Sequence, residues 1–395
     1  MTTRVFISGI GVVAPGAIGI DAFRDLLRSG RSAIAAVDRF DTAGLRAKNA
    51  ALVRDFTPRE FINPMKMRRM NTLSRVGLAA AKLALRDAGV ESLDAAGGVA
   101  IGTAFGPVQT SVDYMQEYVE KGAALAPPQL FAESVANAPG SHIAIELGLR
   151  GFNITVTQRE SSALAAAMYA SSQIVKGAVP LALIGGVEEV NEMIFSVLDR
   201  VGALSSGPGG AVRPFDRDRD GTLPGEGGAV LIAGGAGRYA SLAGFGIARD
   251  ASATISDWGS DADAVAMAMR SAIDDAGLRP SDIDAVYASA NGNIRSDRLE
   301  ARALGVAFSG TVPPVVGVKG YFGEYAAGGA LQLVAAVIAA TDGVLHATCG
   351  LSELDSHATF EVVRETRKDN VRNVLVNSLS AGGGVVSAVV SREGT

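Results

Sequence analysis

Short apolar runs that end in glycine recur along the whole chain, and longer alanine-rich stretches separate them. Glycine at such a position permits a positive φ angle and a close approach of the backbone where a strand ends. The alanine-rich stretches have the composition of helices that pack against a sheet. The pattern therefore predicts an α/β protein with helices sandwiched against sheets. The glycine-ended runs are GIGVV near residue 10, GVAIGTAFG at 98–106, LIGGVE at 183–188, GEGGAVLIAGG at 225–235 and GGGVV at 382–386.

Two pairs of segments repeat in the same order along the chain. LALRDAGV at 83–90 matches SAIDDAGL at 271–278, and in each the glycine is suited to stop a helix. A β-prone run follows both. The stretch 165–186 then matches 330–350, each being a long alanine-rich helix, a glycine turn and a strand. Alanine-rich helices resemble one another by composition alone, but two pairs in one order favour an internal duplication.

The duplication predicts two similar halves that meet near 235–240, after the strand-like run AVLIAGG. We expect an N-terminal half over residues 1–235 and a C-terminal half over residues 236–395.

Composition and charge narrow the function. The chain has 395 residues, and 36 Lys+Arg against 41 Asp+Glu give a net charge of -5, so no basic field exists for a nucleic-acid backbone. A hydrophobic share of 48% excludes a disordered chain. One cysteine allows no intrachain disulfide and no cluster of thiolates around zinc, and three histidines argue against a histidine-rich metal site. We expect neither a metal nor a cofactor.

Nothing in the sequence predicts a membrane protein. No uninterrupted apolar segment approaches the roughly 18 residues that a membrane helix needs. The first residues, MTTRVFISGIGVVAPG, are typical of a strand rather than of a signal peptide. We expect a soluble, cytoplasmic protein.

Six ordered motifs then give the chain a family resemblance. It resembles a β-ketoacyl synthase of the thiolase superfamily across nearly its whole length, which implies the duplicated, five-layered αβαβα thiolase fold. The motifs are VFISGIGVVAPG at the start, MKMRRMNTLSRVGLAAAKLALRDAG at 65–89, ANAPGSHIAIELGLRG at 136–151, RPFDRDRDGTLPGEGGAVLI at 213–232, VKGYFGEYAAGGALQ at 318–332 and NSLSAGGG at 377–384.

The resemblance implies three catalytic positions, and this chain has other residues at all of them. In the family a cysteine at a helix start accepts the acyl chain, and two histidines assist decarboxylation and stabilise the enolate. Glu160 stands at the cysteine position, within NITVTQRESSALAAA. Asn291, in SANGN, replaces the first histidine, and Glu324 replaces the second, while the family's Lys319 remains. The loss of all three groups argues against condensation.

Other residues near these motifs have two interpretations each. Leu379 and Ala381 fall where the family carries phenylalanines that gate the site. Cys349, the one thiol, is expected to be structural, at the end of a late strand. Glu160 has two interpretations. The helix dipole alone favours a carboxylate at a helix start. Alternatively, the carboxylate fills the place of the missing cysteine and accepts hydrogen bonds from loop amides. The simplest interpretation of Asn291 and Glu324 is that their polar side chains fill a pocket that has lost its catalytic activity.

The resemblance without catalytic groups matches the chain-length-factor subunits of type II polyketide synthases. Such subunits pair with an active ketosynthase, which supplies the catalysis and the docking of the acyl carrier protein. Their usual replacement for the cysteine is glutamine, so Glu160 leaves the subclass open between aromatic and polyene pathways. The alternatives are a malonyl-carrier-protein decarboxylase of the chain-initiation type, and a stand-alone thiolase-fold protein that binds an acyl chain.

The same resemblance implies an interface and an acyl tunnel. The strand NITVT at 153–157 is expected at the edge where the two subunits join their sheets. The segment 104–135 is expected to close the far end of the tunnel for the growing polyketide chain. Its candidate wall residues are Thr110, Tyr114, Met115 and Phe131. Ordinary packing at the interface is the alternative for each of them.

Overall fold

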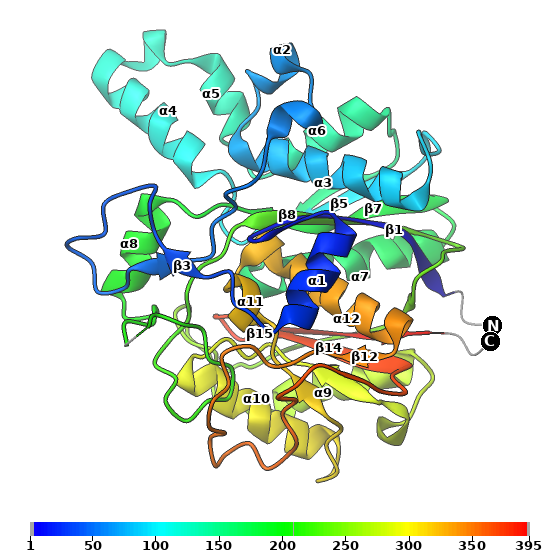
Figure 1. The fold of residues 1–395 in the computed structure, drawn as a ribbon. Helices are drawn as coiled ribbons and strands as arrows, with labels where there is room; N and C mark the ends of the chain where they lie inside the picture. The colour runs from blue at the N-terminus through cyan, green and yellow to red at the C-terminus, as the bar shows by residue number, and fades with distance from the viewer. Residues whose placement is uncertain (1–3, 208, 393–395) are drawn as a thin grey trace.

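The computed structural model describes residues 4–207 and 209–392, and a long mixed sheet runs through them (Figure 1). The strand order is β11-β10-β14-β15-β9-β1-β8-β7-β5-β6, with β2 beside β1. The ten strands of this path are β1 (Val5–Ala14), β5 (Gly98–Gly102), β6 (Asn153–Val156), β7 (Leu181–Glu188), β8 (Gly227–Gly234), β9 (Ser241–Arg249), β10 (Ala285–Tyr287), β11 (Val315–Val316), β14 (Asn373–Leu379) and β15 (Gly384–Ser391). The short strands are β2 (Ala17–Ile18), β3 (Ala35–Ala36), β4 (Asn49–Ala50), β12 (Val344–Leu345) and β13 (Arg367–Lys368).

The strand order repeats. Read outward from the centre, β1-β8-β7-β5-β6 has the same arrangement as β9-β15-β14-β10-β11. In each half the outer three strands are parallel, and the two inner pairings are antiparallel. The halves meet through two residue pairs, Val5 with Leu242 and Phe6 with Ser241. The β-prone runs of the first repeated pair, β5 and β10, thus occupy equivalent places in a repeated topology. The strand within residues 330–350, β12, lies outside this sheet, so its predicted match with β7 is wrong, and β14 holds the place equivalent to β7.

Helices form three layers around the two halves of the sheet (Figure 1). Helices α3 and α6 cover the outer face of the first half, α9 and α10 cover that of the second, and α7 and α12 lie between the halves. This arrangement confirms the predicted αβαβα class. The helices are α1 (Ile20–Ser29), α2 (Pro64–Met67), α3 (Thr72–Ala88), α4 (Val108–Lys121), α5 (Pro128–Glu133), α6 (Ala138–Leu147), α7 (Ser162–Val175), α8 (Glu192–Arg200), α9 (Ala262–Asp275), α10 (Ile294–Ala307), α11 (Lys319–Phe322) and α12 (Ala330–Asp342).

Glycine and alanine together explain how closely the outer helices approach the sheet. A Cβ atom at Gly11 of β1 would lie 1.9 Å from the carbonyl oxygen of Ala80 in α3. In the second half, a Cβ atom at Gly246 of β9 would lie 2.0 Å from the carbonyl oxygen of Ala268 in α9. The same close contact of a glycine strand with an alanine-rich helix therefore occurs in both halves.

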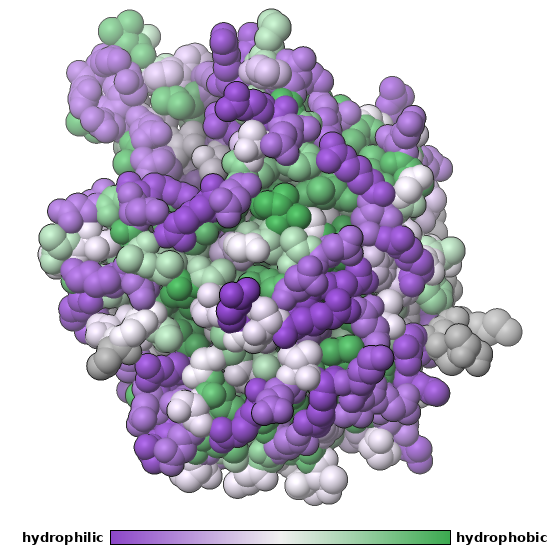
Figure 2. All heavy atoms as spheres, in the orientation of Figure 1, coloured by the Kyte–Doolittle hydropathy of each residue, from purple (hydrophilic) through white to green (hydrophobic). Residues whose placement is uncertain are grey.

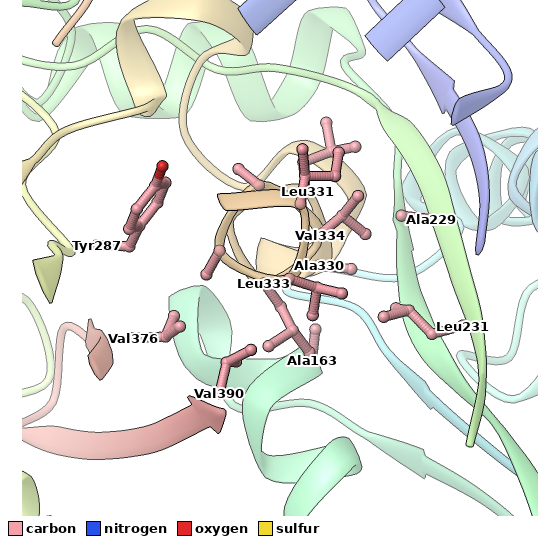
Figure 3. Packing of buried hydrophobic residues seen from close by; sticks show 14 of the residues in the cluster. Ala163, Ala229, Leu231, Tyr287, Ala330, Leu331, Leu333, Val334, Val376 and Val390 are labelled. Carbon is pink, nitrogen blue, oxygen red and sulfur yellow. The ribbon is translucent and has the colours of Figure 1, made fainter. Parts of the chain in front are cut away.

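The central layer forms the largest part of the hydrophobic core. Residues 330–340 of α12 are all buried. Figure 3 shows Leu331, Leu333 and Val334 of α12 between strands of both halves, with Leu231 of β8 on one side and Val376 of β14 on the other. This layer holds the two halves together and places the start of α7 beside the loop that leads into α12. Among the described residues, no helix is long and apolar enough to cross a membrane.

Candidate functional site

The turn between β6 and α7 brings Glu160 into the interior. A short 3₁₀ turn, Arg159–Ser161, joins the strand to the helix, and Arg159 has a φ angle of 47°, which is uncommon for a residue with a side chain. The backbone oxygen of Glu160 accepts a hydrogen bond from Ser378 Oγ at 3.1 Å. The Ser380 hydroxyl donates to the carbonyl oxygen of Gln158 at 3.0 Å. The turn is thus held against the end of β14 and the loop that follows it.

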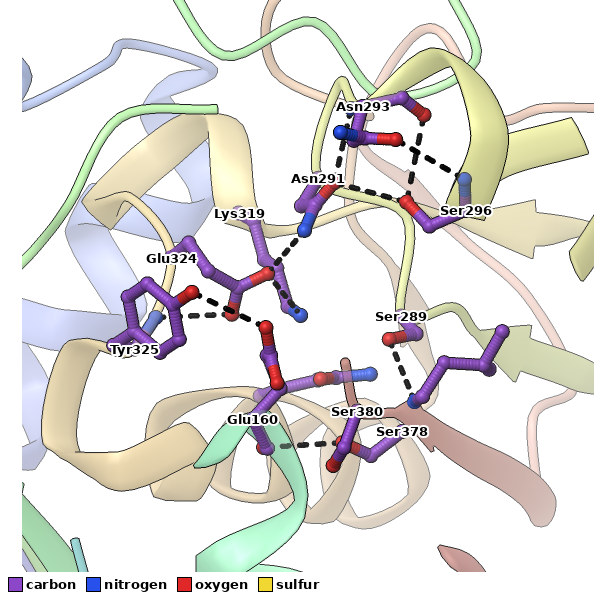
Figure 4. A network of polar contacts seen from close by, with 12 residues as sticks. Glu160, Ser289, Asn291, Asn293, Ser296, Lys319, Glu324, Tyr325, Ser378 and Ser380 are labelled. Carbon is purple, nitrogen blue, oxygen red and sulfur yellow. Dashed lines mark hydrogen bonds and ion pairs between the residues drawn. The ribbon is translucent and has the colours of Figure 1, made fainter. Parts of the chain in front are cut away.

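The Glu160 carboxylate is almost fully buried and has two donors (Figure 4). Tyr325 Oη donates to Oε1, and the backbone N–H of Ala381 donates to Oε2, both at 3.2 Å. Burial, and then the nearby charge of Glu324, raises the pKa of Glu160 to about 7. Glu160 therefore holds the loop after β14, where the resemblance predicts gating residues, against the turn.

Glu324 lies at the centre of the same group of side chains. Its Oε2 accepts from Asn291 Nδ2 at 2.6 Å and from Lys319 Nζ at 2.8 Å. Its Oε1 accepts from the backbone N–H of Tyr325 at 2.9 Å. Lys319 is only 3% exposed, so the ion pair is sheltered from water. Glu160, Asn291, Lys319, Glu324 and Tyr325 are called the carboxylate network below.

Asn291 is fixed from its other side by the start of α10. Its backbone N–H donates to Asp297, and its side-chain oxygen accepts from the backbone of Asn293 at 2.9 Å and from the Ser296 hydroxyl at 3.3 Å. These bonds orient the amide so that its NH₂ group points at Glu324. The structure therefore brings together Glu160, Asn291 and Glu324, the three positions singled out in the sequence, and keeps Lys319 with them.

Tyr325 is the member of the network that the sequence reasoning missed. Its φ angle is 64°, in the left-handed region, and its ring packs edge-on against Phe105 at 4.8 Å between centroids. Burial, with the charges of Glu160 and Glu324, raises the pKa of Tyr325 well above its usual value, so the hydroxyl stays protonated and donates. Its place directly after Glu324 in a matching motif was the available signal.

The thiol and the imidazoles lie outside this network. Cys349 is a free, buried thiol, beyond the end of β12 rather than on it, and burial raises its pKa to about 11. His346 Nδ1 pairs with Tyr287 Oη at 2.6 Å, and burial lowers the pKa of His346 to about 4. His142 and His357 pair with Glu133 and Asp355. Within the described residues, no three His, Cys, Asp or Glu side chains are grouped to hold a metal ion.

The network therefore consists of two carboxylates, one ammonium group, one amide and one phenol. Each of these groups is hydrogen-bonded to another member of the network. Covalent acyl transfer needs an activated nucleophile, and an enolate needs donors that are free to face it. The Asn291 amide and the Lys319 ammonium both donate to Glu324 instead. Leu379, the last residue of β14, is buried, and its backbone N–H donates to the Ser289 hydroxyl. The geometry suits a closed site rather than a reactive one.

The four predicted wall residues lie elsewhere, on the projecting segment formed by α4 and α5 (Figure 1). The rings of Tyr114 and Phe131 lie 5.5 Å apart. Thr110 and Tyr114 are half-buried, whereas Met115 is 52% and Phe131 57% exposed. Met115 does not share the face of Tyr114, because consecutive residues of a helix point about 100° apart. The structure thus groups Tyr114 with Phe131 and leaves Met115 apart.

Comparison with known proteins gives one family. Residues 2–235 match the family model described as "Beta-ketoacyl synthase, N-terminal domain", and residues 239–352 match "Beta-ketoacyl synthase, C-terminal domain". The ketoacyl synthase alpha subunit of the tetracenomycin polyketide synthase of Streptomyces glaucescens is 30% identical, over 98% of this chain and 96% of that protein. The 3-oxoacyl-[acyl-carrier-protein] synthase 2 of Vibrio harveyi is 28% identical, over 96% of both chains.

Solved structures agree with this. The ishigamide ketosynthase/chain length factor superposes with a TM-score of 0.92 at 28% identity and covers both chains completely. A type II polyketide synthase ketosynthase solved with its acyl-carrier protein reaches a TM-score of 0.89 at 21% identity, again over both whole chains, and shows the shared fold. The predicted thiolase-type fold is confirmed.

Proposed function

The chain belongs to the β-ketoacyl synthase family, and from this premise we propose that it is the non-catalytic chain-length-factor subunit of a type II polyketide synthase. It pairs with an active ketosynthase, supports that partner's site and shapes the tunnel for the growing acyl chain. The partner supplies the cysteine, the two histidines and the docking of the acyl carrier protein.

The observation that carries the proposal is the carboxylate network. Three catalytic positions of the family hold Glu160, Asn291 and Glu324, and their side chains are engaged with Tyr325, Lys319 and one another. A carboxylate cannot replace a thiolate that forms and releases thioesters. No imidazole belongs to the described network, so an enolate oxygen would meet no free donor. A site whose polar groups are hydrogen-bonded to one another suits a subunit that leaves chemistry to its partner.

A partner surface is supported by the edge strand β6. Within the described sheet β6 pairs with β5 and lies at the end of the strand order. A strand edge of this kind presents unpaired backbone groups and associates readily. The Tyr169 ring of α7 packs edge-on against Phe152, the residue just before β6, and stays 36% exposed. Val175 of α7 and Ile247 of β9 are about half exposed. These side chains would extend an interface from β6 across the neighbouring elements.

The relatives support the same assignment. One structure that matches over its whole length is a ketosynthase/chain length factor, and one curated relative is a ketoacyl synthase subunit of a polyketide synthase. The two alternative functions gain nothing from the site. A decarboxylase of the chain-initiation type would need Asn291 to face a substrate, and its amide faces Glu324.

Co-expression with an active ketosynthase from the same biosynthetic system tests the proposal. We expect native mass spectrometry to show a one-to-one complex, and condensation that is lost when the partner's cysteine is changed to alanine. Decarboxylation of malonyl-carrier protein by the chain alone would instead support the chain-initiation alternative. A monodisperse homodimer that ignores the ketosynthase and binds a fatty acid would support the acyl-binding alternative.

A further inference from the structure

Helices α4 and α5, residues 108–133, form an arm that projects from the body of the protein (Figure 1). None of the residues of α4 is buried. A hollow of about 260 Å³ lies between its first turns and the start of α3, and its lining includes Arg68, Arg75, Gln109 and Thr110. Figure 2 shows polar side chains over much of the projecting end in this view. Apolar packing against the body therefore cannot by itself fix where this arm stands.

Two consecutive glutamates, the last residue of β7 and the residue after it, hold the base of the arm. Glu189 Oε1 accepts a hydrogen bond from the backbone N–H of Gln109, in the first turn of α4, at 2.8 Å. Glu188 accepts from the Thr103 hydroxyl at 3.2 Å and from the Ala104 N–H at 2.5 Å, in the loop that leads into the arm. Both glutamates are buried. A carboxyl group on first-turn amides is favoured by their unsatisfied donors and by the helix dipole.

A third glutamate holds the far end of the arm. Glu133, the last residue of α5, accepts from the Asn71 N–H at 2.9 Å and pairs with His142 Nε2 at 2.8 Å. The Asn71 side chain returns a bond to the Glu133 carbonyl oxygen at 2.7 Å and also caps α3. The arm is therefore tied at both ends to rigid elements, and between these ends it borders a hollow.

We propose that Glu189 and Glu133 are positioning residues that set the place of the α4–α5 arm and, through it, the length of acyl chain that fits. The second step rests on the proposed function. Tyr114 lies five residues beyond the Gln109 amide that Glu189 holds, about 7.5 Å along the helix. Phe131 lies two residues before Glu133 and meets Tyr114 ring to ring. A shift at Glu189 or Glu133 therefore moves Tyr114 and Phe131 even though neither aromatic residue is changed.

Hydrogen exchange of the whole chain, measured by mass spectrometry, tests the base anchor. Glu189→Ala should speed exchange in peptides covering 105–121 by about tenfold or more, because a buried bond to an amide is lost. Glu189→Gln keeps an acceptor oxygen and, since burial raises the pKa of Glu189, is a close substitute; it should exchange like wild type. Glu91→Ala, at an exposed glutamate, is the matched control. Unchanged exchange in a folded Glu189→Ala variant would overturn the anchor.

The far anchor is tested with His142→Ala, which removes one partner of Glu133 and leaves Asn71 in place. Exchange should then rise in peptides covering 122–135 and stay at the wild-type rate at the base of α4. Equal protection of both peptides in this variant and in wild type would refute a role for Glu133.

Product analysis of the assembled heterodimer tests the second step. Glu189→Ala should spread the acyl chains over at least one further two-carbon unit, and Glu189→Gln should restore one length. A loosened arm with unchanged products in an intact complex would overturn the link to chain length. If the wild-type chain pairs with no ketosynthase, the proposed function fails, and the exchange experiment still decides whether Glu189 positions the arm.

Discussion

The hydroxyl of Tyr325 donates a hydrogen bond to Oε1 of Glu160 across 3.2 Å and joins two residues that lie 165 positions apart in the sequence. Tyr325 also donates its backbone N–H to Glu324. It therefore connects Glu160 with Glu324, which the motifs predict to stand at the family's cysteine position and at its second histidine position.

Replacement of Glu160 by glutamine should flatten the dependence of stability on pH. Folding raises the pKa of Glu160 from 4.5 to about 7, so the folded state binds this proton more tightly than the unfolded state. The free energy of unfolding then falls as the pH rises through this range, and the stabilisation is lost above about pH 7. Urea titrations at pH 5 and pH 8 should show a smaller fall for Glu160→Gln than for wild type.

The same variant also tests the role of Glu160 in synthesis. Condensation by the heterodimer should stay within a few-fold of wild type for Glu160→Gln, because the partner holds the catalytic groups. Loss of condensation from an intact complex would show that the carboxylate takes part in the chemistry.

Removal of the Tyr325 hydroxyl should weaken the fold measurably. In Tyr325→Phe, the buried Glu160 loses one of its two donors, and an unsatisfied buried acceptor costs about 1–3 kcal/mol. Chemical denaturation measures this loss. Tyr169→Phe, at a partly exposed tyrosine on α7, is the control and should change stability little. Equal midpoints for both variants would contradict the view that the phenol holds Glu160.

Loss of the Lys319 charge should lower the stability of the fold, because this charge balances the negative charge of the buried carboxylates. Lys319→Met leaves Glu324 without its ion pair, and breaking a buried pair costs about 3–5 kcal/mol. A second change, Glu324→Gln, should recover much of the loss because it removes the unpaired charge. The control is Lys121→Met, at an exposed lysine paired with Glu117 on α4, which should have little effect. A single variant as stable as wild type would show that the charges are balanced elsewhere.

Truncation of the aromatic pair tests the tunnel wall. Tyr114→Ala or Phe131→Ala should let elongation continue by one or more two-carbon units, since either change vacates the room of several methylenes. Because Phe131 is 57% exposed, its cost in stability should lie well below the ~3–5 kcal/mol of a buried aromatic residue. Leu125→Ala, on the exposed turn of the same arm, is the control. Mass spectrometry of carrier-bound chains would reject the assignment if lengths were unchanged for both variants in a folded complex.

The sequence by itself determined the fold class and singled out four residues that the fold brings together. Glycine at strand ends, alanine-rich helices and repeated segments are local patterns, and they translate directly into strands, helices and a repeated order. The motifs likewise identified Glu160, Asn291, Glu324 and Lys319, because each stands at a fixed place within its own short segment. Three points stay predictions: the division of the chain at 235/236, the residues of the tunnel wall and the absence of catalysis at the site.

Only the tertiary structure decided what these residues do to one another. The Asn291 amide meets Glu324 across 33 positions, and the Ala381 N–H meets Glu160 across 221 positions. No pattern within one segment predicts such partners, because they depend on how the layers pack. The role of Tyr325, in the loop between α11 and α12, and of Glu188 and Glu189, at the end of β7, likewise follows from segments that only packing brings together. Hydrogen bonds act over about 3 Å, and only folding brings segments that are distant in the sequence to within this distance of each other.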